Sequence, residues 1–240
     1  MRNDLKGRRK EAYVERLFSS IAPKYDLLNS VLSLSRHKAW RRFAVSKSGL
    51  THGGSALDVC CGTGDFAFEL AKKAGIIGRI VGIDFSLPMI ELAKRKAKRR
   101  GRRSVKFLAA NACALPFANG SFDCVTIGFG LRNVADVSVA LSEMARVTKP
   151  GGKVISLEIS RVRSALVSLP WRLYFYALTP YTATAFRAKR QAYEYLPRSV
   201  REFMSHEELS KEFENCGLRN VACYHLTFGV VCVHVGTKGT

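Results

Sequence analysis

The residues best suited to binding chemistry are two glycines and a carboxylate, each placed just past an apolar run. Residues 56–60 have the composition of a buried strand, and Gly62 and Gly64 follow at once. Glycine adopts backbone angles that other residues resist, so a ligand can lie against this turn. A second run, residues 80–84, ends in an acid about 20 residues on, where two oxygens can accept both hydroxyls of a ribose. This order predicts a nucleoside-binding site.

The same turn leaves two other interpretations open. Residues 62–67 formally fit the Gly-x-Gly-x-x-Gly/Ala fingerprint of dinucleotide-binding proteins, so NAD is an alternative cofactor. A glycine turn that merely connects a strand to a helix is the other interpretation. Residues farther along the chain must decide between them.

Further polar residues follow the later predicted strands. Asn111 comes just past a strand expected over residues 105–108, where its amide can hydrogen-bond an adenine edge. A strand over residues 122–127 ends in the segment 128–133, at the sheet edge where α/β folds place their chemistry. Before the glycine turn, Tyr25, His37 and Trp40 belong either to an ordinary helical cap on the sheet or to a lid that lines the ligand pocket.

A doubly wound α/β sheet would bring these side chains together. Apolar runs predict strands over residues 56–60, 80–84, 105–108, 122–127, 153–159, 221–227 and 230–235. Helical spacing fills most of the intervals, and Ser205 with Glu208 has the spacing of a capping box. The last two strands predict an antiparallel hairpin on a mostly parallel sheet, unlike the usual end of an NAD-binding domain. The aromatic, basic segment 164–197 suits a helical cover over an apolar substrate, an interfacial helix or core packing.

The charge balance predicts an anionic partner. The chain carries 39 Lys and Arg against 19 Asp and Glu, a formal charge of +20. A generally basic proteome is the alternative explanation, because net charge concerns association and not fold. The densest block, residues 94–103, suits lipid phosphates, nucleic acid or a solvated helix end. No aromatic residues that could stack on bases interleave it, which argues against nucleic acid.

Cysteine and histidine usage predicts neither a disulfide framework nor a metal site. The seven cysteines form no C-x-x-C pair, and an odd number suits a reducing cytoplasm. The five histidines are scattered and lack ligand spacing. No signal peptide and no bilayer-spanning apolar run are found, and the length predicts a single domain.

Several long motifs, in the correct order, resemble one family. Residues 25–40 (YDLLNSVLSLSRHKAW) and 146–160 (RVTKPGGKVISLEIS) are similar to the two signatures of the ubiquinone/menaquinone biosynthesis C-methyltransferases, of the demethylmenaquinone methyltransferase type. Residues 129–133, 193–196 and 226–234 are also family-like. The resemblance covers about residues 12–238. It implies a Rossmann-like class I methyltransferase with S-adenosylmethionine as its cofactor. The glycine turn alone could not distinguish this cofactor from NAD.

Position by position, the resemblance implies a set of cofactor contacts. Methionine and ribose contacts fall on Asp58, Gly62, Thr63, Gly64 and Asp84. Adenine contacts fall on Asn111 and Ala112, where family members commonly have Asp-Ala. Gly128 stands where a further contact is often a serine, so a side-chain contact is lost there.

The resemblance also implies catalytic residues. Arg132 and Asn133 match an Arg-Asn pair for which a catalytic role is proposed, with Tyr25 and His37 as further groups near the substrate. Arg132 stays protonated and cannot be the base, so it would hold a phenolate or orient a water that Asn133 positions. A surface ion pair between Arg132 and Asp136 is the plain structural alternative.

These implications predict C-methylation of a reduced polyprenyl quinone, with demethylmenaquinol favoured. The single methyltransferase domain would comprise an N-terminal helical lid (1–45), a cofactor-binding core (46–160), an inserted helical substrate cover (161–200) and a C-terminal helix and hairpin (201–240). Because such a substrate lies in the bilayer, the enzyme must approach the anionic membrane surface. We therefore expect a cytoplasmic enzyme that is peripheral to the inner face of the cytoplasmic membrane and contacts it transiently. A homodimer is a family-level expectation. Methylation of a soluble small molecule at carbon or nitrogen, or an RNA-binding methyltransferase-like protein, are the alternatives.

Overall fold

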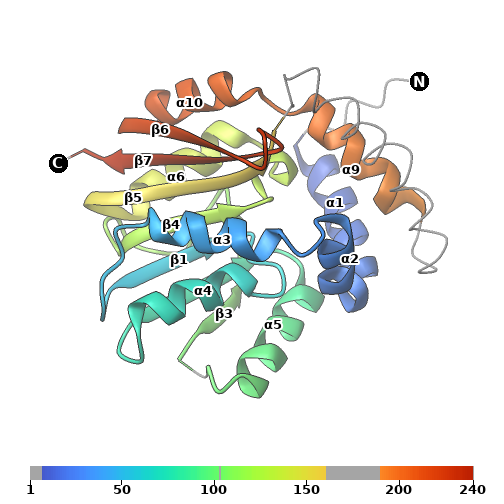
Figure 1. The fold of residues 1–240 in the computed structure, drawn as a ribbon, viewed down its shortest axis with the longest axis horizontal. Helices are drawn as coiled ribbons and strands as arrows, with labels where there is room; N and C mark the ends of the chain where they lie inside the picture. The colour runs from blue at the N-terminus through green and yellow to red at the C-terminus, as the bar shows by residue number, and fades with distance from the viewer. Residues whose placement is uncertain (1–6, 103, 161–189, 240) are drawn as a thin grey trace.

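The structure, a computed structural model, describes residues 7–102, 104–160 and 190–239. Its centre is a seven-stranded sheet in the order β3-β2-β1-β4-β5-β7-β6 (Figure 1). The strands are β1 (Ser55–Val59), β2 (Arg79–Asp84), β3 (Lys106–Ala109), β4 (Phe122–Gly128), β5 (Thr148–Ile159), β6 (Leu218–Leu226) and β7 (Val231–Lys238). Strands β1 to β5 run parallel, and β7 lies antiparallel between β5 and β6. The predicted fold class is confirmed.

The strand order creates a topological switch between β1 and β4. From β1 the chain adds β2 and β3 on one side, then crosses back and adds β4 and β5 on the other. Connections that leave adjacent strands in opposite directions open a crevice beyond the carboxyl ends, where such folds bind ligands. The loops after β1 and β4 both begin at this crevice.

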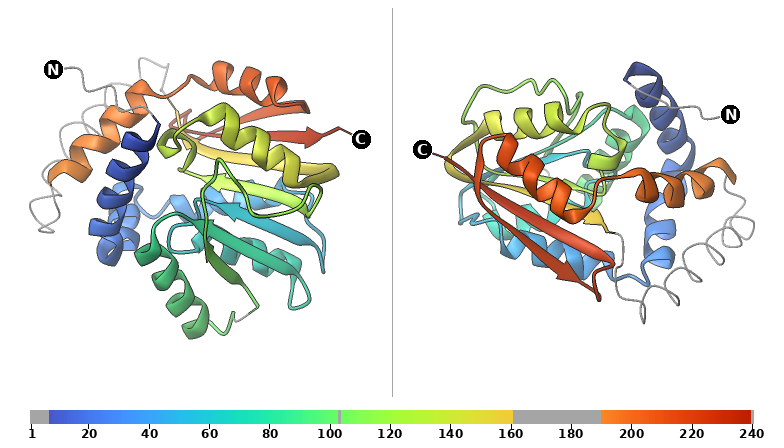
Figure 2. Two further views of the ribbon diagram at one scale, coloured as in Figure 1. Left: turned by 180° about the vertical axis from the view of Figure 1, so that it is seen from behind. Right: turned by 90° about the horizontal axis from the view of Figure 1, so that it is seen from above.

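Helices cover both faces of the sheet and its carboxyl edge. On one face lie α3 (His37–Ser46), α4 (Asp65–Ala74) and α5 (Leu87–Arg99), and on the other lie α6 (Val137–Val147) and α10 (His206–Asn215). Near the carboxyl ends of the parallel strands lie α1 (Arg8–Ile21), η1 (Ala22–Lys24), α2 (Tyr25–Leu32), η2 (Leu131–Asn133) and α9 (Arg190–Glu202) (Figures 1 and 2). The edge that holds the crevice is therefore the one that the N-terminal helices cover.

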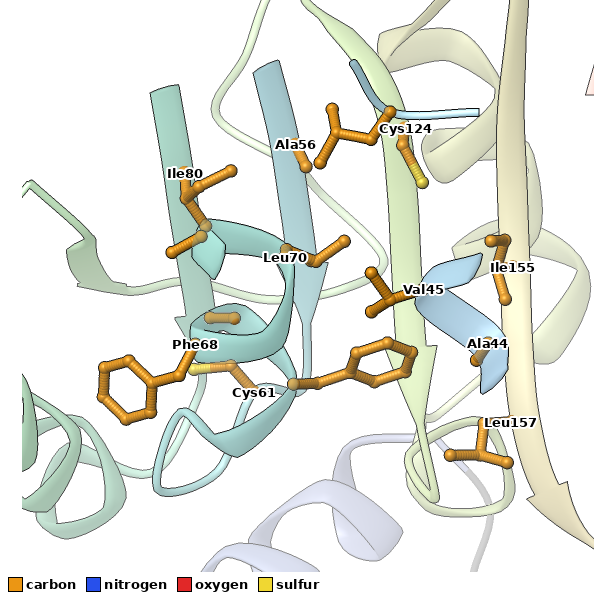
Figure 3. Close-up of a cluster of buried hydrophobic side chains, with 14 of the residues drawn as sticks. Ala44, Val45, Ala56, Cys61, Phe68, Leu70, Ile80, Cys124, Ile155 and Leu157 are labelled. Atoms are coloured by element: carbon orange, nitrogen blue, oxygen red, sulfur yellow. The ribbon is translucent and has the colours of Figure 1, made fainter. Parts of the chain in front are cut away.

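The central strands are buried on both faces, which explains their continuous apolar runs. Ala56 of β1 belongs to the core under α4, whereas the next residue, Leu57, belongs to the core under α6. Figure 3 shows the first of these cores, where Leu70 of α4 and Val45 of α3 pack toward the sheet. Within the described residues, no helix is long and apolar enough to cross a bilayer.

Most predicted elements are found within a few residues of their expected bounds. The capping box of Ser205 and Glu208 is present at the start of α10. The largest shift is in β5, which begins at Thr148 and not at residue 153, because Thr148 pairs with Phe122 before a register irregularity. The predicted cover over residues 161–200 lies outside the described residues as far as residue 189, and only α9 represents it.

Candidate active site

Three cavities adjoin one another at the carboxyl edge of the sheet. The outer cavity, of about 220 Å³, shares Cys60, Phe85 and Asn133 with a small junction cavity of about 30 Å³. The junction cavity in turn shares Phe18, Tyr25 and Phe129 with an apolar cavity of about 110 Å³. Because neighbouring cavities share lining residues, the three lie next to one another along this edge of the sheet.

The turns that line the junction have unusual backbone angles. Gly62 has φ 54°, and the non-glycine residues Cys60 and Phe129, just after β1 and β4, have φ 53° and 58°. Such angles are strained for residues with a Cβ, and strain of this kind gathers at functional sites. At Gly64, φ is 86° and an added Cβ would lie 2.7 Å from the Phe107 ring, so only glycine fits there.

Asp84 ties the glycine turn to the end of β2. Its Oδ2 accepts the N–H of Gly62 at 2.9 Å, and its Oδ1 accepts the N–H of Ser86 at 2.9 Å. Burial raises the pKa of the Asp84 carboxyl, and these hydrogen bonds oppose the rise. Each carboxylate oxygen has a second lone pair, so Asp84, which lines the junction cavity, can still accept two hydroxyls.

Asn111 and Ala112 line the outer cavity, as does Glu11 of α1. The Nδ2 of Asn111 donates to Glu11 Oε1 at 3.0 Å, and its Oδ1 accepts the N–H of Cys113 at 2.8 Å. Glu11 was not predicted as a site residue, because only the packing of α1 against the sheet brings it there. A ligand in the outer cavity would meet an amide that Glu11 already orients.

Gly128 lines the junction cavity, as Gly62 does. An added Cβ at Gly128 would lie 2.8 Å from the ring of Phe66. A serine at this position would therefore require Phe66 to shift. Gly128, where the family often has serine, thus leaves room for the ring of Phe66.

Arg132 lines the apolar cavity and forms a buried ion pair with Glu158 of β5. Its Nη1 donates to Glu158 Oε2 at 2.8 Å and to the carbonyl of Phe129 at 2.7 Å. The two side chains are only 7% and 3% exposed. Burial raises the pKa of Glu158, while the Arg132 charge lowers it. The alternative of a surface pair between Arg132 and Asp136 is wrong, because the partner is a carboxylate inside the sheet.

Asn133 is held from both ends of its amide. Its Nδ2 donates to the carbonyl of Phe129 at 3.1 Å, and its Oδ1 accepts the hydroxyl of Tyr195 at 2.9 Å. Burial raises the pKa of Tyr195 to about 12, so this hydroxyl stays protonated. Tyr195 was not predicted as a site residue, although the family-like segment 193–196 was the signal that could have indicated it.

Comparison with known sequences agrees with this geometry. Residues 6–238 match the model of the ubiE/COQ5 methyltransferase family. The chain belongs to this family. A demethylmenaquinone methyltransferase of Staphylococcus aureus is 44% identical over 225 residues, which are 94% of this chain and 92% of that protein. The predicted family, the enzyme class and the cofactor, S-adenosylmethionine, are thereby confirmed.

Solved structures share the fold of this methyltransferase at low sequence identity. An S-adenosylmethionine-dependent methyltransferase of Aquifex aeolicus aligns with a TM-score of 0.66 at 18% identity, over 89% of this chain and 97% of its own. A chain from the complex of the Haloferax volcanii Trm112 activator with a methyltransferase described as putative aligns with a TM-score of 0.67 at 19% identity, over 93% and 98%. They support the class I methyltransferase architecture.

The residues of this methyltransferase fit the cofactor along the outer and junction cavities. The two cavities adjoin, Asp84 lines the junction cavity and has lone pairs that can accept ribose hydroxyls, and an added Cβ at Gly62 would meet only Tyr25, at 3.5 Å. Asn111 and Ala112 would hold the adenine end, and the turns at Gly62 and Gly128 the methionine end. The apolar cavity then lies beyond the methionine end.

His37 is a neutral base on the wall of the apolar cavity. Burial, with the Arg41 charge, lowers the pKa of His37 to about 4. Its Nδ1 lies 2.6 Å from Ser33 Oγ, and that hydroxyl donates to the carbonyl of Asn29. The Ser33 hydroxyl thus lies between His37 Nδ1 and the carbonyl of Asn29 and fixes the orientation of the ring. Tyr25 and Trp40 line the same cavity, and burial raises the pKa of Tyr25, which keeps its hydroxyl a donor.

Thr63 faces an ion-pair network and lines none of the three cavities. Its hydroxyl donates to Asp26, and it accepts from Lys96 Nζ at 3.0 Å. Lys96 also contacts Asp26 at 2.8 Å and Asp65 at 2.7 Å. The network fastens α2 to the glycine turn. Lys96 belongs to the basic block 94–103, but it is buried and pairs with Asp26 and Asp65, not with lipid or solvent. The exposed cations of the block are Lys94, Arg95, Lys98, Arg99 and Arg100.

Asp58 lies beneath the glycine turn and also lines none of the three cavities. Its Oδ2 accepts the N–H of Ala67 at 3.0 Å, and its Oδ1 accepts the hydroxyl of Thr126 at 3.0 Å. Burial is the main cause that raises the pKa of Asp58 to about 7. In this position the carboxyl supports the turn from below, and its predicted contact with the cofactor stays a prediction.

Asp58→Asn is expected to remove a pH dependence of stability. The native state keeps the Asp58 proton up to about pH 7, whereas the unfolded chain releases it near pH 4, so wild-type stability falls between these values. Asparagine can keep both hydrogen bonds and does not titrate. Urea unfolding at pH 5 and pH 7 should show a larger loss for the wild type, by about 1–3 kcal/mol. Equal losses in both proteins would refute this assignment.

Proposed function

We propose that this enzyme transfers the methyl group of S-adenosylmethionine to a ring carbon of a reduced polyprenyl naphthoquinone, demethylmenaquinol. The observation that carries the proposal is the apolar cavity, which adjoins the junction cavity and combines apolar walls with Arg132, His37 and Tyr25. Such a cavity suits a ring with an apolar tail and two hydroxyls. The name of the 44% identical Staphylococcus aureus protein supports the naphthoquinone ring.

Each wall of the apolar cavity has a separate part in the reaction. Bound S-adenosylmethionine supplies an electrophilic methyl group. Arg132 stabilises the anion that forms when a ring hydroxyl gives its proton to solvent, and this charge makes the adjacent ring carbon nucleophilic. The imidazole of His37 accepts the proton that the methylated ring carbon releases and returns it to the ring oxygen, so that the hydroxyl is restored and one proton is released overall. The apolar residues exclude water and hold the ring in line, and positioning of this kind supplies about 7–11 kcal/mol.

Methyl transfer from labelled S-adenosylmethionine tests the proposal. Reduced demethylmenaquinone and a reduced benzoquinone precursor are offered in parallel, in micelles that contain anionic lipid. We expect label in the naphthoquinone. Label only in the benzoquinone would show that the substrate ring is a benzoquinone. Label in neither, with cofactor binding intact, would favour a soluble small-molecule substrate.

We also propose that the enzyme works in the cytoplasm, at the inner face of the membrane that dissolves its substrate. Two exposed apolar side chains flank the apolar cavity: Leu34, 72% exposed, follows the lining residue Ser33, and Phe228, 81% exposed, precedes Val230 by two residues. The loop at Phe228 is joined to α3, the helix that follows Leu34, because Trp40 Nε1 donates to Thr227 Oγ1 at 2.8 Å. These exposed apolar side chains, together with the formal charge of +20 on the whole chain, suit contact with an anionic lipid surface.

Phe228→Ser is expected to weaken binding to anionic vesicles about tenfold or more, because a large apolar side chain contributes about 1.5–3 kcal/mol when buried. Flotation with phosphatidylglycerol vesicles measures it, and binding of the wild type should fall with added salt. Ile76→Ser is the matched control, since Ile76 is 83% exposed in the turn before β2, at the opposite edge of the sheet. Equal effects of both substitutions would exclude this docking face.

The expected homodimer and the expected lack of RNA binding are checked by light scattering and gel shift.

A further inference from the structure

A second cluster of reactive side chains lies outside the three cavities, where α10 packs on the β6–β7 hairpin (Figure 2). In the hairpin register His225 faces Cys232 and Cys223 faces His234. Because alternate residues of a strand share a face, Cys223 and His225 point to the same side of the sheet. His206, the first residue of α10, lies beside them.

The donor atoms of this cluster are close together. One ligand atom from each of His206, Cys223 and His225 lies within 4.8 Å of the others. The rings of His206 and His225 are 4.6 Å apart between centroids and nearly perpendicular. Atoms that share one tetrahedral zinc are about 3.3–3.8 Å apart, given bonds of about 2.0–2.3 Å. A shift of about 1 Å by side-chain rotation would therefore bring the three onto one ion.

A fourth donor, Cys232, contacts two of these three. The Sγ of Cys232 lies 3.2 Å from His225 Nδ1, and the thiols of Cys223 and Cys232 are in hydrogen-bonding contact. We propose that His206, Cys223, His225 and Cys232 bind a zinc ion. Two imidazoles and two thiolates form the donor set that tetrahedral zinc prefers.

The surroundings suit a bound cation. His206 Nε2 lies 3.2 Å from Glu207 Oε1, a carboxylate contact of the kind that orients metal-binding histidines. His225 is exposed, whereas Cys223 and His206 are half-buried, so an ion can enter from solvent without opening the core. The scattered spacing of these residues in the sequence conceals the cluster, because only the hairpin register and the packing of α10 assemble it.

The site would fasten the C-terminal hairpin to α10. It lies beside the strand that carries the buried ion pair, because Cys232 of β7 pairs with Glu158 of β5, the partner of Arg132. Zinc is thus a structural ion that braces the strand beside the buried ion pair. It has no part in methyl transfer.

Metal binding to the full-length enzyme tests the proposal. The reduced protein, kept with a phosphine reductant, is stripped with a chelator and titrated with zinc against a chromophoric zinc indicator, and in parallel with cobalt(II). We expect one zinc per chain, a rise in Tm with zinc, and a cobalt spectrum with intense visible d–d bands and a thiolate charge-transfer band.

Two substitutions locate the site. Cys223→Ser and His225→Ala, both at positions that are not fully buried, should weaken zinc binding at least tenfold and abolish the zinc-dependent rise in Tm. Cys216→Ser is the matched control, because Cys216 is a half-buried free thiol at the end of α10, outside the cluster, and it should bind zinc as the wild type does. Zinc binding that is absent from the wild type, or equal in the wild type and Cys223→Ser, would overturn the proposal. A Cys223–Cys232 disulfide that persists in the reduced protein would do so as well.

Discussion

Glu158→Ala is expected to destabilise the protein by about 3–5 kcal/mol, because it leaves the Arg132 guanidinium buried without its counter-ion. The Nε of Arg132 already has no hydrogen-bond partner among the described residues. Removal of Glu158 would leave the carbonyl of Phe129 as the remaining acceptor for this side chain. Urea unfolding measures the loss.

The double variant Arg132→Met/Glu158→Leu separates stability from catalysis. When both charges are replaced by apolar side chains of similar size, no buried charge is left unpaired, and such replacements are often neutral or stabilising. We therefore expect the double variant to unfold within about 1 kcal/mol of the wild type or at higher urea. Its kcat should nevertheless fall about 10²–10³-fold, since no cation then faces the ring oxygen.

The exposed pair Arg198–Glu202 is the control, because its charges are also 2.8 Å apart but its side chains are 53% and 62% exposed. Glu202→Ala should cost less than about 1 kcal/mol. If Glu158→Ala costs no more than this, the buried pair does not stabilise the cavity wall. If the double variant keeps full kcat, Arg132 has no electrostatic part in the reaction.

The features that sequence predicted are those in which local pattern and burial agree. The glycine turn, Asp84 and the strand on each side of them were predicted because a buried parallel strand must be apolar throughout and a tight turn needs glycine. Gly128 was identified only as a departure from the family pattern. Its packing against Phe66 needed coordinates, because no local rule relates the end of β4 to the start of α4.

The features that sequence missed depend on contacts between distant segments. The sequence gives no sign that Glu158 pairs with Arg132, because 26 residues separate the two. Lys96 stood within a block of cations that all appeared alike, and only the packing of α5 against α4 and α2 buries it. Tyr195 and the histidine–cysteine cluster likewise result from helices docking on strands. In each case the chemistry is set by tertiary packing, which residue spacing does not encode.

Asp84→Asn is expected to weaken binding of S-adenosylmethionine about tenfold or more while the protein stays folded. A hydrogen bond to a carboxylate contributes about 1.5–3 kcal/mol, so loss of one of the two bonds to the ribose hydroxyls corresponds to about tenfold or more. Asparagine is of the same shape and its oxygen can still accept the N–H of Gly62 and one hydroxyl, but its amide group can accept neither the second hydroxyl nor the N–H of Ser86. Isothermal titration calorimetry with S-adenosylhomocysteine gives the affinity without turnover.

The matched control for Asp84→Asn is Glu91→Gln, which removes the same charge from the helix that follows β2. Glu91 is exposed and pairs only with the exposed Lys94 among the contacts described for it, so its loss should leave the affinity within about twofold. The affinity of the wild type should fall on acidification at a higher pH than for an ordinary aspartate, because burial raises the pKa of Asp84. In Asp84→Asn this dependence should vanish. If Asp84→Asn binds the cofactor as tightly as Glu91→Gln, the carboxylate only closes the turn on Gly62, and the ribose must be held by other groups along the outer and junction cavities.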